Sequence, residues 1–191
     1  MRKKKPVCEH EWVDYKCTKC GQFATDDDFS LISDNTWELG SLSEIKEKLS
    51  PELFTLHIGI NITGNFQCDG WHNIFMYQGR LLPHTEAVLD ELGLQEIKNS
   101  FSKIITRFPK FASDEFTCDN CDELKFLYGA YWELPEEELR KYSEEERTKI
   151  ADYNRLIEEL DNISDKYFGY DTPYDGWESV IVYIKKLHNT D

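Results

Sequence analysis

The chain has 191 residues with 37 acidic and 22 basic side chains, so its formal net charge is −15 at pH 7. Its 40% apolar and 14% aromatic side chains are enough for a hydrophobic core, which excludes a disordered low-complexity chain and a collagen-like repeat. No apolar run approaches the roughly 20 residues that a membrane helix needs, and no apolar segment follows the basic start as in a signal peptide. We therefore expect a cytoplasmic protein.

The negative charge also restricts the partners of this chain. Nucleic-acid-binding proteins neutralise phosphates with Lys and Arg side chains, so an excess of carboxylates disfavours direct binding to nucleic acid. Anionic membrane surfaces are disfavoured for the same reason. A basic partner protein is favoured, and an acidic surface that serves only solubility is the alternative.

The charge changes sign along the chain. Residues 1–23 hold six basic and three acidic side chains, whereas the remaining 168 residues hold 16 basic and 34 acidic ones. This step predicts an N-terminal segment over 1–23, a connector over 24–40 and an acidic domain over 41–191. The run Asp26-Asp27-Asp28 is typical either of a solvated connector or of a helix start.

Four metal-binding side chains fall within thirteen residues of the N-terminal segment, namely Cys8, His10, Cys17 and Cys20. Zinc prefers four tetrahedral sulfur and nitrogen ligands, and two cysteines separated by two residues are its usual clamp. Gly21 allows the backbone to turn tightly after the second cysteine. Because the protein fills every coordination position, we expect one structural zinc ion. A disordered basic tail with incidental cysteines and a disulfide are the alternatives.

A second metal site is conceivable from Cys68, His72, Cys118 and Cys121. On a helix, Cys68 and His72 would lie four residues apart on one face. The two halves of this set are far apart in the sequence, so only the fold can unite them. We favour the alternative that these cysteines are partly buried free thiols, which behave as small apolar residues.

Apolar residues at helical spacing, together with capping signals, predict helices along most of the chain. Ser41 and Ser143 begin capping boxes, in which a side-chain oxygen precedes a glutamate by three residues. Ser50 and Pro51 form a further start signal, because proline is tolerated in the first helical turn. Alternating β-branched side chains make a strand the alternative over 58–63. The expected helices cover residues 42–49, 51–60, 83–92, 95–108, 135–142, 144–160 and 174–187.

The predicted fold class is therefore all-α, with a single multi-helix acidic domain and a small N-terminal zinc-knuckle-like segment. Residues from about 40 to 190 also carry a set of short motifs. A glycine-rich entry precedes an aromatic helix, and two apolar-acidic helices follow later in the chain. The motifs are Gly64-Asn65-Phe66, Asp69-Gly70-Trp71-His72-Asn73-Ile74-Phe75, Ala87-Val88-Leu89-Asp90-Glu91-Leu92-Gly93, Phe108-Pro109, Leu156-Ile157-Glu158-Glu159-Leu160-Asp161 and Tyr183-Ile184-Lys185-Lys186-Leu187-His188. Together these motifs resemble the bacterial DNA-mimic protein domain.

This resemblance implies an all-α bacterial or phage protein that often forms a homodimer. Its carboxylates would imitate DNA phosphates, occupy the basic site of a nucleic-acid-binding protein and inhibit that protein. The resemblance carries no catalytic residues.

The charge density of DNA limits which carboxylates can serve this role. Duplex DNA presents one charge per about 1.7 Å of its axis, whereas one carboxylate per helical turn gives one per about 5.4 Å. Two or three acidic rows must therefore converge. Acids in first helical turns also favour the helix dipole, so an ordinary solvated helix face is the alternative. The candidate partner-binding residues are Glu136, Glu137, Glu138, Glu144, Glu145, Glu146, Asp152, Glu158, Glu159 and Asp161.

Enzyme functions are disfavoured. The chain lacks a P-loop, a Gly-x-Gly-x-x-Gly motif and a Gly-x-Ser-x-Gly elbow. Its histidines are scattered, and a lone histidine is more often a core or surface residue than a base. We expect a DNA-mimic inhibitor, and the alternative is an immunity- or adaptor-type protein that neutralises a basic toxin or effector without resembling DNA. An enzyme would need a pocket with perturbed carboxylates or an open metal site.

Overall fold

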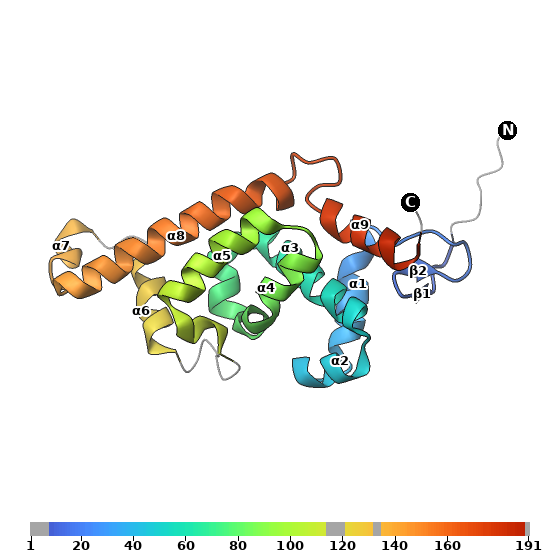
Figure 1. The fold of residues 1–191 in the computed structure, drawn as a ribbon, viewed down its shortest axis with the longest axis horizontal. Helices are drawn as coiled ribbons and strands as arrows, with labels where there is room; N and C mark the ends of the chain where they lie inside the picture. The colour runs from blue at the N-terminus through green and yellow to red at the C-terminus, as the bar shows by residue number, and fades with distance from the viewer. Residues whose placement is uncertain (1–7, 114–120, 132–134, 190–191) are drawn as a thin grey trace. The chain divides into compact units, whose positions relative to one another are not determined.

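A computed structural model of the chain describes residues 8–113, 121–131 and 135–189 (Figure 1). These residues form nine α-helices, two short 3₁₀-helices and a two-stranded antiparallel hairpin, which confirms the all-α fold class. None of the helices in these ranges combines the length and apolarity of a membrane span. The elements are β1 (Trp12–Val13), β2 (Lys16–Cys17), α1 (Asp26–Trp37), α2 (Leu42–Lys48), α3 (Pro51–Tyr77), η1 (Gly79–Leu81), α4 (Leu82–Glu91), α5 (Gln95–Arg107), η2 (Pro109–Ala112), α6 (Asp122–Tyr131), α7 (Glu136–Leu139), α8 (Glu144–Phe168) and α9 (Glu178–Leu187).

The chain divides into two compact units. Unit 1 comprises residues 1–57 and 180–191, and unit 2 comprises residues 58–179. Unit 2 holds 25 acidic and 12 basic side chains and so carries −13, whereas unit 1 holds 12 acidic and 10 basic ones and carries −2. The division expected after residue 23 stays a prediction, because compactness alone does not define a functional domain.

Unit 1 contains helices that begin where capping chemistry favours them. The Asp28 carboxylate accepts the backbone N–H of Thr25 at 3.0 Å, and Glu44 accepts that of Ser41 at 2.7 Å. Of the two interpretations of the aspartate run, the structure therefore shows the helix start, which opens α1. Phe29 of α1 is buried.

Helix α3 is buried on all sides over residues 54–60. A helix that is apolar all round can lie in a core, so the β-branched run over 58–63 is helical and not a strand. The helix breaks at Asp69 and Gly70, where Gly70 has φ 70° and ψ −172°. This break divides α3 into a first half that ends before Asp69 and a second half that begins at Trp71.

Unit 2 has an aromatic core. Helix α5 packs against α4 and α8, and α6 also packs against α8. The predicted helices over 83–92, 95–108 and 144–160 are confirmed as α4, α5 and α8. The predicted helix over 135–142 is shorter, because α7 has only four residues. Fully buried aromatic side chains in this core are Trp71, Phe75, Phe101, Phe108, Phe111, Tyr153 and Phe168.

Candidate metal centre

The N-terminal segment is shaped by a two-residue hairpin turn. Strands β1 and β2 pair Trp12 with Cys17. The turn residues Asp14 and Tyr15 both have positive φ, 48° and 63°, as a type I′ turn requires. A bulky residue is rarely found there, but Tyr15 is only 4% exposed and its carbonyl accepts the N–H of Ala24 at 2.9 Å. The burial of the Tyr15 side chain and the hydrogen bond from Ala24 therefore stabilise the turn.

A second turn joins the two cysteines of the Cys-x-x-Cys pair. Gly21 donates its backbone N–H to the carbonyl of Cys17 at 2.9 Å. Its φ is 75°, and a Cβ atom at this position would meet nothing within 4 Å. The left-handed backbone, and not crowding, therefore explains the glycine.

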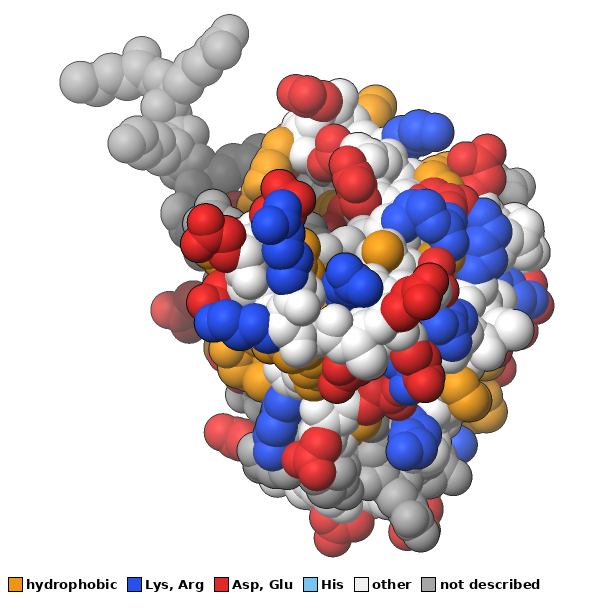
Figure 2. Space-filling view, turned by 90° about the vertical axis from the view of Figure 1, so that its left-hand side faces the viewer, with side chains coloured by type: hydrophobic (Ala, Val, Ile, Leu, Met, Phe, Trp, Pro, Cys, Tyr) orange, Lys and Arg blue, Asp and Glu red, His pale blue; other side chains and the backbone are white. Residues whose placement is uncertain are grey.

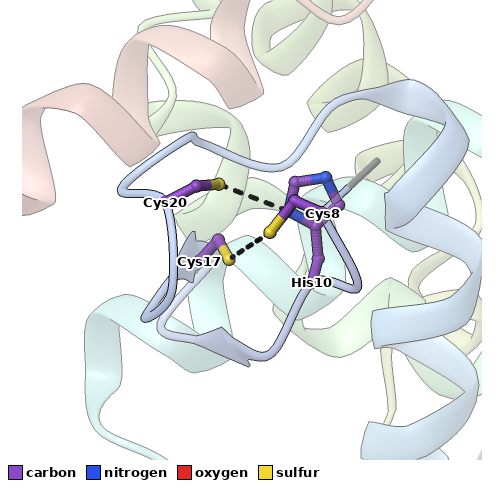
Figure 3. Close-up of side chains that lie close together, drawn as sticks. All are labelled: Cys8, His10, Cys17 and Cys20. Carbon is purple, nitrogen blue, oxygen red and sulfur yellow. Dashed lines mark hydrogen bonds between the residues drawn. The ribbon is translucent and has the colours of Figure 1, made fainter. Parts of the chain in front are cut away.

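The four predicted ligands converge (Figure 3). One donor atom from each of Cys8, His10, Cys17 and Cys20 lies within 4.8 Å of the others. Cys8 Sγ lies 3.9 Å from Cys17 Sγ, and His10 Nδ1 lies 3.6 Å from Cys20 Sγ. Cys17 is buried, whereas Cys20 is exposed. This cluster could hold a metal ion.

The thiols of the cluster differ in acidity. Burial, together with hydrogen bonds with Cys20 and Cys17, raises the pKa of Cys8 to about 11. Burial also acts to raise the pKa of Cys17, but hydrogen bonds from His10 and from backbone N–H groups outweigh it and lower this pKa to about 5. Without a metal ion, Cys17 is therefore ionised more readily than Cys8.

Aromatic rings support the cluster from both ends of the chain. The His10 ring stacks on Trp12 with ring centroids 4.7 Å apart. His188, which follows α9, donates from Nε2 to the carbonyl of Asp14 at 2.7 Å, and its ring lies 5.4 Å from Phe23. In the sequence His188 is one of the scattered histidines. No local sequence signal connects it with the hairpin, because 174 residues separate it from Asp14.

The three described members of the second set of potential ligands, Cys68, His72 and Cys121, do not form a cluster. Cys68 is exposed, Cys121 is buried, and Cys118 lies outside the described residues. His72 stacks on Tyr128 with centroids 4.3 Å apart, and its Nδ1 lies 3.1 Å from the Tyr153 hydroxyl. Burial lowers the pKa of His72 to about 4, so the ring is a neutral core residue. Within the described ranges, only the N-terminal cluster brings three or more potential ligands together.

The candidate partner-binding acids of α7 and of the first turn of α8 are partly neutralised. Glu136 pairs with Arg140 at 2.9 Å, and Glu145 pairs with Lys149 at 3.3 Å. Glu138 pairs with Lys141 at 2.5 Å. Glu146 caps α8, because its carboxylate accepts the backbone N–H of Ser143 at 2.8 Å.

The middle of α8 carries an ion-pair network with α5. Asp152 pairs with Arg107 at 2.9 Å, and Glu159 pairs with Lys103. Arg155 lies 3.8 Å from both carboxylates. Asp161 points into the fold, where its Oδ1 accepts the Trp71 N–H at 2.8 Å.

Five of the ten candidates form no ion pair with any residue that the structure describes. Of these five, Glu146 and Asp161 accept backbone N–H groups, which leaves Glu137, Glu144 and Glu158. All three side chains are exposed. Figure 2 shows Asp and Glu side chains interspersed with Lys and Arg on the face that it draws, without a continuous acidic stripe. The carboxylates therefore differ in how freely they can meet a partner.

No family model, no curated protein and no solved structure matches this chain. The resemblance to the DNA-mimic domain stays a prediction, and the function must be argued from the residues themselves.

Proposed function

We propose that Cys8, His10, Cys17 and Cys20 bind one zinc ion in a structural site. Tetrahedral zinc, with Zn–S near 2.3 Å and Zn–N near 2.05 Å, separates two sulfurs by about 3.8 Å and a sulfur from a nitrogen by about 3.6 Å. The separations of 3.9 Å and 3.6 Å in the cluster support this assignment. Four protein ligands leave no open position for substrate, so the ion would stabilise the hairpin and its turns.

We further propose that the protein acts by binding, through unit 2, to a basic surface of another protein. The observation that carries this proposal is the segregation of charge, −13 on unit 2 against −2 on unit 1. A surface of one sign steers a partner of the opposite sign and accelerates encounter. Glu137, Glu144 and Glu158 are the acids among the ten candidates that are best placed to form new ion pairs.

This binding function has a stricter form and a broader form. In DNA mimicry the partner is a nucleic-acid-binding protein, and the carboxylates replace phosphates. In the broader form the protein is an adaptor or an immunity-type inhibitor whose surface does not imitate DNA. The ion pairs of Asp152 and Glu159 favour the broader form, because a carboxylate shared with Lys or Arg adds little to a phosphate-like array.

A pull-down with the full chain as bait tests this proposal. Three baits are compared: the wild type, a Glu137→Gln/Glu144→Gln/Glu158→Gln variant, and an Asp34→Asn/Glu38→Gln/Glu47→Gln variant. The last changes three exposed acids of unit 1 by the same total charge. We expect capture of a basic protein that weakens with salt and is lost with the unit 2 variant alone.

Duplex DNA added as competitor separates the two forms. Displacement of the captured protein by DNA supports mimicry, and retention supports the adaptor form. Capture of no basic protein, or equal loss with both variants, contradicts the proposed function.

A further inference from the structure

A cavity lies at the break in helix α3, within unit 2. It has a volume of about 380 Å³ and is lined by Phe66, Gln67, Asp161, Asp165, Phe168 and Tyr170, among others. We call it the kink cavity. Its size is at the lower end for ligand pockets, which suits a head group and not a large cofactor.

The backbone break and helix α8 build this cavity together. Gly70 departs from helical geometry, and a Cβ atom there would lie 3.0 Å from Asp161 Oδ1. The Asp161 carboxylate takes the place of the missing helical partner for the Trp71 N–H. Gln67 donates from Nε2 to the carbonyls of Phe168 and Asp175, at 2.9 and 2.5 Å, so it ties the end of α8 and the following loop to α3.

The charge of the kink cavity is uncompensated. Asp161 and Asp165 lie one helical turn apart on α8, and neither Lys nor Arg is among the described residues that line the cavity. The larger groove between α5 and α8, of about 640 Å³, is different, because its lining includes Lys103, Arg107 and Arg155 beside Asp152 and Glu159. The carboxylates of the kink cavity therefore have no basic side chain in the described lining to neutralise them, which leaves them accessible to an external cation.

Aromatic side chains form the other wall. The rings of Phe66 and Phe168 lie 5.5 Å apart and are only 8% and 1% exposed, so Tyr170, which is 67% exposed at the rim, is the ring that is open to a ligand. Burial, together with the charge of Asp165, raises the pKa of Asp161 to about 6 although the hydrogen bond from Trp71 lowers it, so an incoming cation would relieve an unfavourable negative charge. Carboxylates beside aromatic rings suit a planar, weakly hydrated cation with several N–H donors.

We propose that the kink cavity binds the guanidinium group of an arginine side chain on the partner protein. This inference rests on the proposed function, because it requires a basic partner. A metal ion is disfavoured, since Asp161 and Asp165 do not belong to a group of three close ligands among the described residues. A pocket with a perturbed carboxylate also suits an enzyme, but the bond from Trp71 gives Asp161 a structural role.

The test uses the full ¹⁵N-labelled chain and a small probe, Nα-acetyl-arginine N-methylamide. The corresponding citrulline compound has nearly the same shape without the charge, and the lysine compound has the charge without the planar fork. The readout is the chemical shift of the Trp71 backbone amide, which is bonded to Asp161. We expect a saturable shift with arginine and none with citrulline. An equal response to citrulline or lysine, or no saturable shift, would overturn the assignment.

Two variants and a matched control locate the site. Asp161→Asn and Asp165→Asn should each weaken arginine binding about tenfold, which corresponds to one lost charge-assisted hydrogen bond. Glu91→Gln makes the same change of charge at an exposed acid of unit 2 outside the cavity and should leave the Kd within about twofold. If all three variants weakened arginine binding equally, the effect would be one of general electrostatics, and the proposed site would be contradicted.

The source of the arginine is tested separately. A Gly-Arg-Gly peptide with blocked ends should bind at least as tightly as free L-arginine, and tenfold preference for the free amino acid would overturn a protein source. A partner captured from lysate without arginine binding at the kink cavity contradicts this inference alone. Arginine binding without any captured partner leaves the site standing and contradicts the proposed function instead.

Discussion

The backbone N–H of Trp71 donates a 2.8 Å hydrogen bond to Asp161, a residue 90 positions later in the chain. The bond satisfies the first turn of the second half of α3, where a continuous helix would have used its own carbonyls. It also places a half-buried carboxylate beside a cavity. One contact therefore connects the backbone break, the packing of α8 and the proposed arginine site.

Replacing Gly70 by alanine should destabilise the protein by about 1–3 kcal/mol, because its φ of 70° is strained for any other residue and its Cβ would crowd Asp161. Gly129 is the matched control. It lies in α6, where an added Cβ atom would meet nothing within 4 Å, so Gly129→Ala should stabilise by about 0.5–1 kcal/mol. Urea denaturation measures both values. Equal effects at the two positions would refute the role of Gly70.

The pKa values of Asp161 and His72 predict opposing effects of acid on stability. The pKa of Asp161 is raised from 3.8 to about 6, so the native state binds its proton more tightly and gains stability as pH falls from 6 toward 4. The pKa of His72 is lowered from 6.5 to about 4, so the native state loses stability over nearly the same range.

Asp161→Asn removes only the first of these contributions. Its free energy of unfolding should therefore fall more steeply between pH 7 and pH 4.5 than that of the wild type. Urea midpoints at intervals of half a pH unit provide the comparison, and Glu158→Gln is the control because its carboxylate is exposed. Parallel curves for wild type and Asp161→Asn would show that Asp161 titrates normally.

Zinc removal should unfold the N-terminal hairpin. Cys17→Ser replaces the buried ligand of the cluster, so bound zinc should fall from one equivalent to less than about 0.1, and stability should fall by at least about 2 kcal/mol. Elemental analysis and thermal melting with and without a chelator measure the two effects. Cys68→Ser, at an exposed cysteine outside the cluster, should retain full zinc and an unchanged Tm. Full zinc in Cys17→Ser would refute the ligand assignment.

The contact between His72 and Tyr153 should contribute to the stability of the aromatic core. Tyr153→Phe keeps the ring against Phe108 and Phe111 but removes the hydroxyl that lies 3.1 Å from His72 Nδ1. We expect a loss of about 1–3 kcal/mol, since a buried hydrogen bond is removed without a solvent replacement. Tyr170→Phe, at an exposed ring, should change stability by less than about 0.5 kcal/mol. Urea denaturation of both variants beside the wild type provides the comparison, and equal losses would contradict a role for the buried hydroxyl.

Structural features that depend on residues close together in the chain could be predicted from the sequence. The four potential metal ligands lie within thirteen residues, and the local turns at Asp14-Tyr15 and at Gly21 bring them together. The starts of α2, α3 and α8 follow from local capping groups and proline. Helix α6 was not predicted, and for α1 the sequence offered only a helix start at the aspartate run, as one of two interpretations.

The sequence by itself thus determined the helical class, the cluster of four potential metal ligands and the excess of acid. Only the tertiary structure decided which acids are paired, since Asp152 meets Arg107 and Glu159 meets Lys103 across two helices. It alone also placed His72 in the core and formed the kink cavity from α3 and α8. Such contacts join residues 45 to 101 positions apart, and long-range packing rather than local backbone preference selects them.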